Sequence, residues 1–150
     1  MVQSHACVNI HLVFSTKGRR EFIVDAIRSD LHAYMSAISR REGADVHEVG
    51  GIEDHVHMLV HLPRTLTLAS LAEKIKSGSS KWIKTKGTEF QLFAWQNGYG
   101  VFSVSQSQVP CVRRYIQEQR AHHRKWNFQE ELRALLTRHG ISFDERDLVT

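Results

Sequence analysis

At 150 residues, the chain has the length of one domain and is long enough to bury a core without disulfide or metal staples. Apolar residues make up 41% and charged residues 24%, with only two prolines, which excludes a long disordered region. The formal net charge of +4 is compatible with a nucleic-acid partner without proving one. We expect a single domain over residues 1–150.

Cysteine usage and apolar run length bear on the compartment. Cys7 and Cys111 fit neither a disulfide framework nor a CxxC metal spacing, which favours a reducing environment. The apolar runs are far shorter than the roughly 20 residues of a membrane span, and no basic-then-apolar leader is visible. We therefore expect a cytoplasmic protein with no membrane partner.

The first part of the chain predicts a strand, a helix and two more strands. Residues 6–14 are β-branched and partly alternating, and residues 23–42 place apolar side chains at steps of three and four. Residues 46–49 and 55–62 read as two strands joined by a turn at the paired glycines 50 and 51. In the second of these strands, the face that carries His55 and His57 is expected to lie open.

The rest of the chain adds a helix, a strand and C-terminal helices. Thr67 is a suitable N-cap for a helix that continues to Ile83, and residues 99–104 alternate as a fourth strand after a loop. Helices are expected over 112–123 and 128–136. The order predicts an α+β fold, a ferredoxin-like or RNA-recognition-like βαββαβ sandwich with an antiparallel sheet plus C-terminal helices.

His55 and His57 form the first chemically suggestive pair. Residues two apart on a strand share a face with Cα atoms roughly 6 to 7 Å apart, so both imidazoles can meet one divalent ion. The alternative is that both are polar residues on a wet sheet face.

Tyr115 and Gln119 form the second pair. A spacing of four places both on one helix face. Tyrosine can act as a covalent nucleophile, but with a pKa of about 10 it needs help in losing its proton, which a divalent ion can supply. The alternative is that Tyr115 packs its ring in the core and hydrogen-bonds its hydroxyl, as expected for Tyr34 and Tyr99.

Several segments in order resemble the single-tyrosine HUH transposases of the insertion sequence 200/605 group, in which U is a bulky apolar residue. His55-Val56-His57 has the HUH form. The resemblance runs nearly end to end, through HLVFSTKGRR at 11–20, DHVHMLV at 54–60, KSGSSKWI at 76–83, WQNGYGVFSVS at 95–105, YIQEQRAHH at 115–123, FQEEL at 128–132 and HGISFDER at 139–146.

The resemblance implies an enzyme of DNA transposition and recombination, carried by a mobile element. By similarity, His55, His57 and Gln119 hold Mg²⁺ or Mn²⁺, and Tyr115 forms a 5′-phosphotyrosine while freeing a 3′-hydroxyl. The imidazole-rich set favours Mn²⁺ in isolation, whereas cellular abundance favours Mg²⁺. The covalent intermediate stores the phosphodiester energy, so strand exchange needs no ATP, in keeping with the absence of a P-loop motif and of a nucleotide cofactor.

The resemblance also implies partners. The family acts as homodimers in which the tyrosine helix can complete the partner's site, so composite active sites and a swapped helix are expected. The implied substrate is single-stranded DNA with hairpins near the element ends. Basic side chains that could contact its phosphates are Lys17, Arg19, Arg20, Lys74, Lys76 and Lys81, for which plain solvation is an equal alternative.

Structural roles are expected for four further histidines, whereas Asp54 has two possible roles. His122 and His123 follow the tyrosine face and are expected to pack or hydrogen-bond at the helix end, and His11 and His61 are expected to be structural. Asp54 either closes a turn or orients a ligand histidine.

Two other functions remain open. One is a domesticated relative that processes chromosomal repeat hairpins by the same chemistry. The other is a non-catalytic single-stranded nucleic-acid-binding module, although the strand positions expected to carry stacking rings hold histidines and Leu59 instead.

Overall fold

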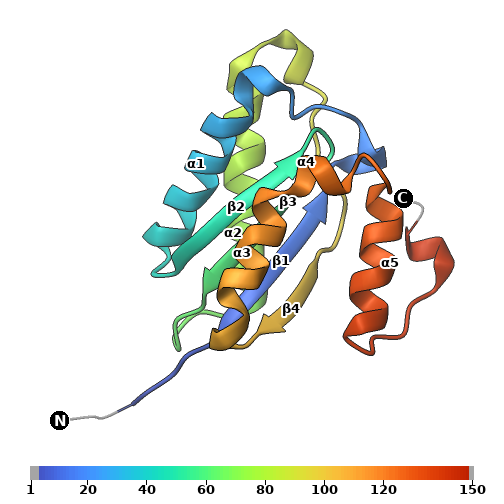
Figure 1. Ribbon diagram of the computed structural model, residues 1–150. Helices are drawn as coiled ribbons and strands as arrows, with labels where there is room; N and C mark the ends of the chain where they lie inside the picture. The colour runs from blue at the N-terminus through green and yellow to red at the C-terminus, as the bar shows by residue number, and fades with distance from the viewer. Residues whose placement is uncertain (1–3, 149–150) are drawn as a thin grey trace.

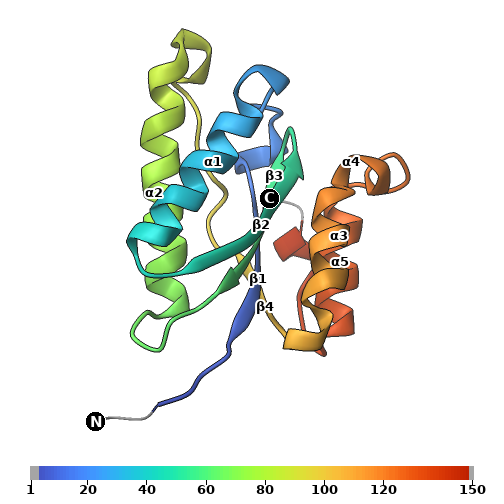
Figure 2. The ribbon, with the colours of Figure 1, turned by 60° about the vertical axis from the view of Figure 1, so that its left-hand side comes forward.

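The computed structural model describes residues 4–148 as one four-stranded sheet with helices on both faces (Figures 1 and 2). The strands are β1 (Asn9–Ser15), β2 (Asp45–Ile52), β3 (His55–His61) and β4 (Gly100–Val104). The helices are α1 (Asp25–Arg41), α2 (Leu68–Ile83), α3 (Val109–Gln117), α4 (Gln119–His122) and α5 (Phe128–Arg138). None of the described helices is long and apolar enough to cross a membrane.

The sheet has the order β2-β3-β1-β4 with every neighbouring pair antiparallel. Strand β3 therefore lies between β1 and β2, and β1 lies between β3 and β4, which is the split βαβ arrangement. Helices α1 and α2 cover one face, and α3, α4 and α5 cover the other (Figure 2). The expected α+β sandwich with an antiparallel sheet and C-terminal helices is confirmed.

The main core lies between the sheet and helices α1 and α2. It contains Leu12, Leu31, Met58 and Ile75, each at most 1% exposed. Thr67 caps α2 as expected, since its side chain accepts a hydrogen bond from the backbone N–H of Ser70. Two smaller clusters, around Phe102 and around Leu59, fasten α5 and α3 to the opposite face.

That opposite face is not open, which corrects the sequence-based expectation. His55, His57 and Leu59 are all buried, because the C-terminal helices lie across them. The alternation along β3 correctly separated two faces, but it could not show that three short helices from the end of the chain return to cover the second one. The bare sheet that an RNA-recognition-like module uses for stacking is therefore covered here.

The paired glycines are not a turn, which is a second correction. Gly50 and Gly51 lie inside β2, and the chain reverses at Glu53 and Asp54. Gly50 is opposite His57 in the sheet, and a Cβ added to it would lie 2.5 Å from the Ile116 carbonyl oxygen. A residue without a side chain is needed here because α3 passes directly over the strand.

Gly50→Ala should therefore push α3 away from the sheet. We expect a loss of about 1–3 kcal/mol in the free energy of unfolding, the usual cost of overpacking, together with a displaced Tyr115, which α3 carries. Urea denaturation measures the first effect. An unchanged midpoint would contradict the close packing seen between Gly50 and Ile116.

His32 on α1 gives the fold a dependence on pH that is independent of the site. Its Nε2 is buried and has no hydrogen-bond partner among residues 4–148. Burial, helped by the charge of Arg28, lowers the pKa of His32 to about 4. In the unfolded state His32 has a pKa near 6.5 and binds the proton more readily. Its contribution to the free energy of unfolding is therefore fully present above pH 6.5 and falls as the pH drops towards 4.

We expect the wild type to lose ~3 kcal/mol more than His32→Gln between pH 7 and pH 4. Urea unfolding curves at several pH values provide the measurement. The other buried histidines titrate in both proteins, so only the difference between them reports on His32. Parallel stability curves for the two proteins would show that His32 is not held neutral by the fold.

Candidate active site

His55 and His57 project from β3 into the space beneath the C-terminal helices, as their spacing predicted, and both are fully buried. The Nδ1 of His55 lies 2.7 Å from Asp54 Oδ1, so this nitrogen carries a proton, and Nε2 faces the centre of the site. The Nδ1 of His57 lies 2.7 Å from His11 Nε2, and this hydrogen bond fixes the orientation of the second ring. Asp54 and His11 thus position the two histidines.

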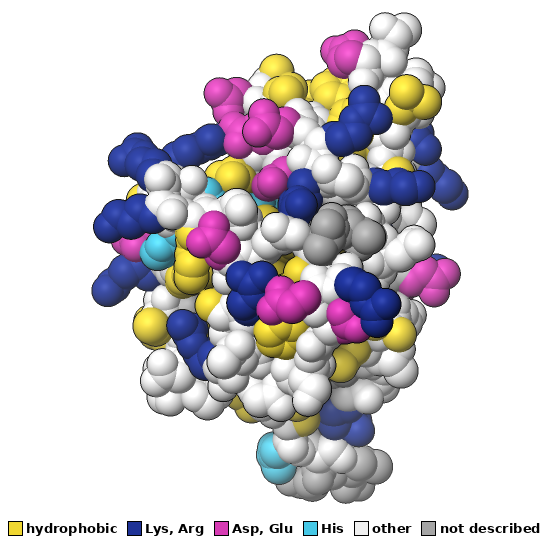
Figure 3. Space-filling model, turned by 90° about the vertical axis from the view of Figure 1, so that its right-hand side faces the viewer, with side chains coloured by type: hydrophobic (Ala, Val, Ile, Leu, Met, Phe, Trp, Pro, Cys, Tyr) yellow, Lys and Arg dark blue, Asp and Glu magenta, His cyan; other side chains and the backbone are white. Residues whose placement is uncertain are grey.

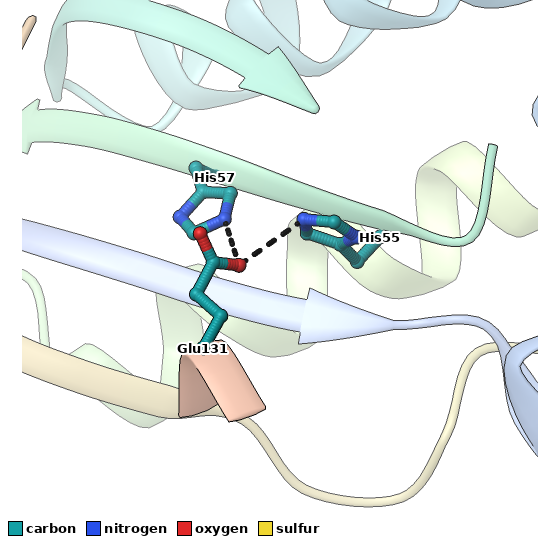
Figure 4. A group of neighbouring side chains, drawn as sticks. All are labelled: His55, His57 and Glu131. Atoms are coloured by element: carbon teal, nitrogen blue, oxygen red, sulfur yellow. Dashed lines mark hydrogen bonds and ion pairs between the residues drawn. The ribbon is translucent and has the colours of Figure 1, made fainter. Parts of the chain in front are cut away.

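Glu131 is the residue that sequence reasoning missed. It projects from the first turns of α5 towards both histidines (Figure 4), with Oε1 3.0 Å from His57 Nε2 and 3.3 Å from His55 Nε2. Its side chain is fully buried. The sequence did contain a signal that could have identified Glu131. This residue falls in line with the apolar residues Phe128 and Leu135 on the buried stripe of an amphipathic helix.

A capping box fixes where α5 begins and hence where Glu131 lies. The Asn127 side chain accepts from the Glu130 backbone N–H, and the Glu130 side chain accepts from the Asn127 backbone N–H. One residue later, Glu131 is held over β3 while Phe128 packs into the cluster around Phe102.

Tyr115 and Gln119 reach the same carboxylate from the other side. The Tyr115 hydroxyl donates to Glu131 Oε2, and the Gln119 amide donates to that oxygen at 2.9 Å. Gln119 Oε1 also lies 2.9 Å from His55 Nε2. Tyrosine, amide and histidines are therefore brought together within one chain.

The helix that carries this pair is not continuous, contrary to the expected helix over 112–123. It ends at Gln117, and α4 starts at Gln119 after Glu118, whose φ of −98° and ψ of 21° are not helical. The offset turns Gln119 inwards, where it is 1% exposed. A break without proline or glycine leaves no simple mark in the sequence.

The two histidines after Gln119 have different surroundings. His123 Nε2 lies 3.1 Å from both Gln119 Oε1 and Glu131 Oε1, so His123 belongs to the network at the site. The His122 ring stacks on Tyr115 with centroids 4.6 Å apart. His61 ends β3, half-buried and away from this network.

The charges of the network are strongly coupled. Burial opposes ionisation of His55, but its hydrogen bonds to Asp54 and Glu131 prevail and raise its pKa to about 9. Burial lowers the pKa of His57. Burial disfavours the charged form of Glu131, yet the surrounding histidines outweigh it and lower the pKa of this carboxyl. Burial, together with the charge of Glu131, raises the pKa of Tyr115 above its usual 10.

The donor set fits a divalent metal ion. Adjacent ligands of an octahedral ion with bonds of about 2.1 Å lie about 3.0 Å apart, close to the distances from Glu131 Oε1 to the two histidines. One nitrogen from each histidine and one Glu131 oxygen all lie within 4.8 Å of one another. Imidazole suits transition metals and carboxylate suits Mg²⁺ and Mn²⁺, so the set is compatible with Mn²⁺.

The predicted DNA-contacting basic residues lie in two places. Lys17, Arg19 and Arg20 follow the end of β1, where Ser15 is opposite His55. Arg19 donates to the Leu148 carbonyl at 3.2 Å, and the Arg20 guanidinium lies over the Phe22 ring. This turn is thus at the same end of the sheet as His55.

The second group, Lys74, Lys76 and Lys81, is on α2, across the sheet from the histidines. Lys76 donates to the carbonyls of Gln96 and Gly98 at 2.7 and 2.8 Å, so its ammonium holds the loop before β4. On the face that carries α5, basic and acidic side chains are interspersed rather than gathered in one patch (Figure 3). Contact of any of these residues with DNA stays a prediction.

The family model for "Transposase IS200 like" matches residues 4–119, which include the HUH strand, Tyr115 and Gln119. The chain belongs to this IS200-like transposase family. The family resemblance predicted from the sequence is therefore confirmed. Helix α5 and Glu131 lie beyond the matched segment.

Individual known proteins are also similar to this chain. The ISDra2 transposase TnpA of Deinococcus radiodurans is 21% identical over 114 residues, covering 73% of this chain and 81% of that protein. A crystal structure of a protein assigned as a transposase, from the same species, superposes with a TM-score of 0.62 at 20% identity, covering 79% of this chain and 98% of the other. The structure of a REP-associated tyrosine transposase bound to a REP hairpin superposes with a TM-score of 0.60 at 13% identity, covering 82% of this chain and 74% of the other. The two structures share the fold of this transposase.

Proposed function

We propose that this transposase nicks and rejoins single-stranded DNA at element ends through a 5′-phosphotyrosine on Tyr115, with a divalent metal ion held by His55, His57 and Glu131. The observation that carries the proposal is the convergence of the Tyr115 hydroxyl and both HUH histidines on one buried carboxylate. In this set Glu131 takes the third ligand position expected of Gln119, whose amide instead supports Glu131 and His55.

The reaction conserves the number of phosphodiester bonds. The Tyr115 oxygen bonds to phosphorus, and the bond from phosphorus to O3′ breaks. The Tyr115 phenol loses one proton, and the leaving 3′-oxygen gains one to become the 3′-hydroxyl. Glu131 accepts the hydrogen bond of Tyr115 and so orients its oxygen. When bound, the ion supplies Lewis-acid stabilisation of the charged phosphate. A second 3′-hydroxyl reverses the step and joins a new strand.

Two parts of this proposal rest on the family. The first is that the recognised DNA carries subterminal hairpins, and the second is that the protein serves a mobile element rather than a domesticated role. The REP-associated transposase that shares the fold was solved with a REP hairpin. A domesticated relative that processes repeat hairpins would use the same residues. The number and placement of hairpins around the gene separate the two.

The active site is proposed to be complete within one chain. Tyr115, His57 and Glu131 of the same chain are already in contact or within one hydrogen bond of one another. The composite sites expected from the resemblance are the alternative to this proposal, and subunit mixing, set out in the Discussion, decides between the two. Formation of a homodimer stays a prediction.

The test of the chemistry is covalent capture. Incubated with Mn²⁺ and single-stranded DNA from its own element end, the wild type should form an adduct that survives denaturing electrophoresis. Tyr115→Phe should abolish it, whereas Tyr99→Phe, which changes an exposed tyrosine, should not. An adduct that persists in Tyr115→Phe would overturn the assignment of the nucleophile.

A further inference from the structure

A groove leads from the surface to Tyr115, the proposed nucleophile. It lies over β4 between α3 and α5 and has a volume of about 270 Å³. Its walls include Phe102, Ser103, Cys111, Tyr115, Arg138 and His139. His55, His57 and Glu131 are fully buried, whereas Tyr115 is half-buried and forms part of the wall. The groove therefore offers DNA a route to the tyrosine.

One wall carries an aromatic ring that is held in place. The ring of His139, an exposed residue, stacks on buried Phe102, with centroids 4.6 Å apart and planes 29° from parallel. Its Nδ1 donates to the Leu135 carbonyl at 2.9 Å, which fixes the ring further. Fixed aromatic and imidazole rings are the surfaces on which proteins stack unpaired bases.

The charge of the groove suits a nucleic-acid backbone. Arg138 is exposed at its rim and forms no ion pair within residues 4–148, whereas Arg133 on the same helix pairs with Glu145 at 2.7 Å. The positive charge of Arg138 also acts on the Tyr115 hydroxyl. None of the described residues that line the groove is acidic. A phosphate next to the one attacked by Tyr115 would meet an unpaired guanidinium here.

We propose that this groove binds the nucleotide adjacent to the scissile phosphate, with its base against His139 and its outer phosphate at Arg138. The proposal rests on the proposed function and adds a binding site to it. The volume is near the lower end, roughly 300 Å³, of small-ligand pockets, which suits one unpaired base rather than a base pair. The groove would thus contribute to the choice of single-stranded DNA.

Oligonucleotides with an abasic residue on either side of the cleavage position test the base contact. With the wild type and Mn²⁺, we expect one of the two abasic positions to slow adduct formation about 10-fold or more, from lost stacking. Ser103→Tyr, which fills the groove from an exposed strand position, should react slowly with intact DNA and no longer distinguish the abasic substrate. Equal sensitivity to the abasic residue in Ser103→Tyr and wild type, or none in wild type, would overturn the proposal.

Two arginines on α5 test the phosphate contact. Arg138→Ala should raise the DNA concentration for half-maximal adduct formation several-fold. The matched variant Arg133→Ala, outside the groove, should not change it. Equal effects of the two substitutions would indicate a general charge effect and contradict a phosphate site at Arg138.

A binding readout separates failure of the groove from failure of the chemistry. Cys111 lines the groove, so in Cys7→Ser the same oligonucleotide should protect it from alkylation. Protection without any wild-type adduct would support the groove and reject the proposed function. An adduct that depends on Tyr115, with Cys111 unprotected, would support the function and reject the groove.

Discussion

Glu131→Gln should leave the protein folded but weaken Mn²⁺ binding by at least about 10-fold, the lower end of what the loss of even an outer partner costs a metal site. The glutamine keeps the volume and one accepting oxygen, which can serve the histidines or Tyr115 but not both, and the negative charge facing the ion is gone. Adduct formation should fall at least as far. Isothermal titration with Mn²⁺ and the covalent capture assay measure the two effects.

Glu130→Gln is the matched control, because it makes the same charge change one residue earlier, at an exposed position where glutamine can still complete the capping box. Glu131→Ala should behave differently from both. It leaves buried His55, His57 and His123 around a missing partner, so we expect a loss of about 3–5 kcal/mol in metal-free stability. Unchanged Mn²⁺ binding in Glu131→Gln, with binding lost in Gln119→Ala, would instead support the ligand set implied by the resemblance.

The fold was predictable because its strands and first two helices have strong, regular patterns. Alternation in 55–62 and the apolar spacing in 23–42 each correspond to one buried face, and the order of elements then leaves few topologies. Tyr115 and the two histidines could also be singled out from the sequence, because their local spacings, weak when taken alone, occur in a series of segments that resembles the family.

The parts that were missed depend on contacts between distant segments. Glu131 meets His57 across 74 residues, and no local spacing predicts that contact. Strand β2 continues through Gly50 and Gly51, and α3 packs over it at Gly50. A glycine pair that is typical of a turn is therefore part of a strand here. A buried acidic residue within an apolar stripe, as in α5, was the one signal that could have identified the missing carboxylate.

Mixing Tyr115→Phe with His57→Ala should give no covalent adduct above the level of either variant alone. If each site uses the tyrosine, histidines and glutamate of one chain, every chain in the mixture lacks an essential group. If sites were composite, dimers formed by random pairing would restore up to about a quarter of the wild-type sites. The two chains are co-refolded so that subunits can exchange, and adduct is measured with Mn²⁺ and saturating DNA. Wild type diluted fourfold into Tyr115→Phe calibrates that level. Restoration would show that the helix carrying Tyr115 works on the partner's metal site, and the contact between Tyr115 and Glu131 in one chain would then describe a resting arrangement rather than the reacting one.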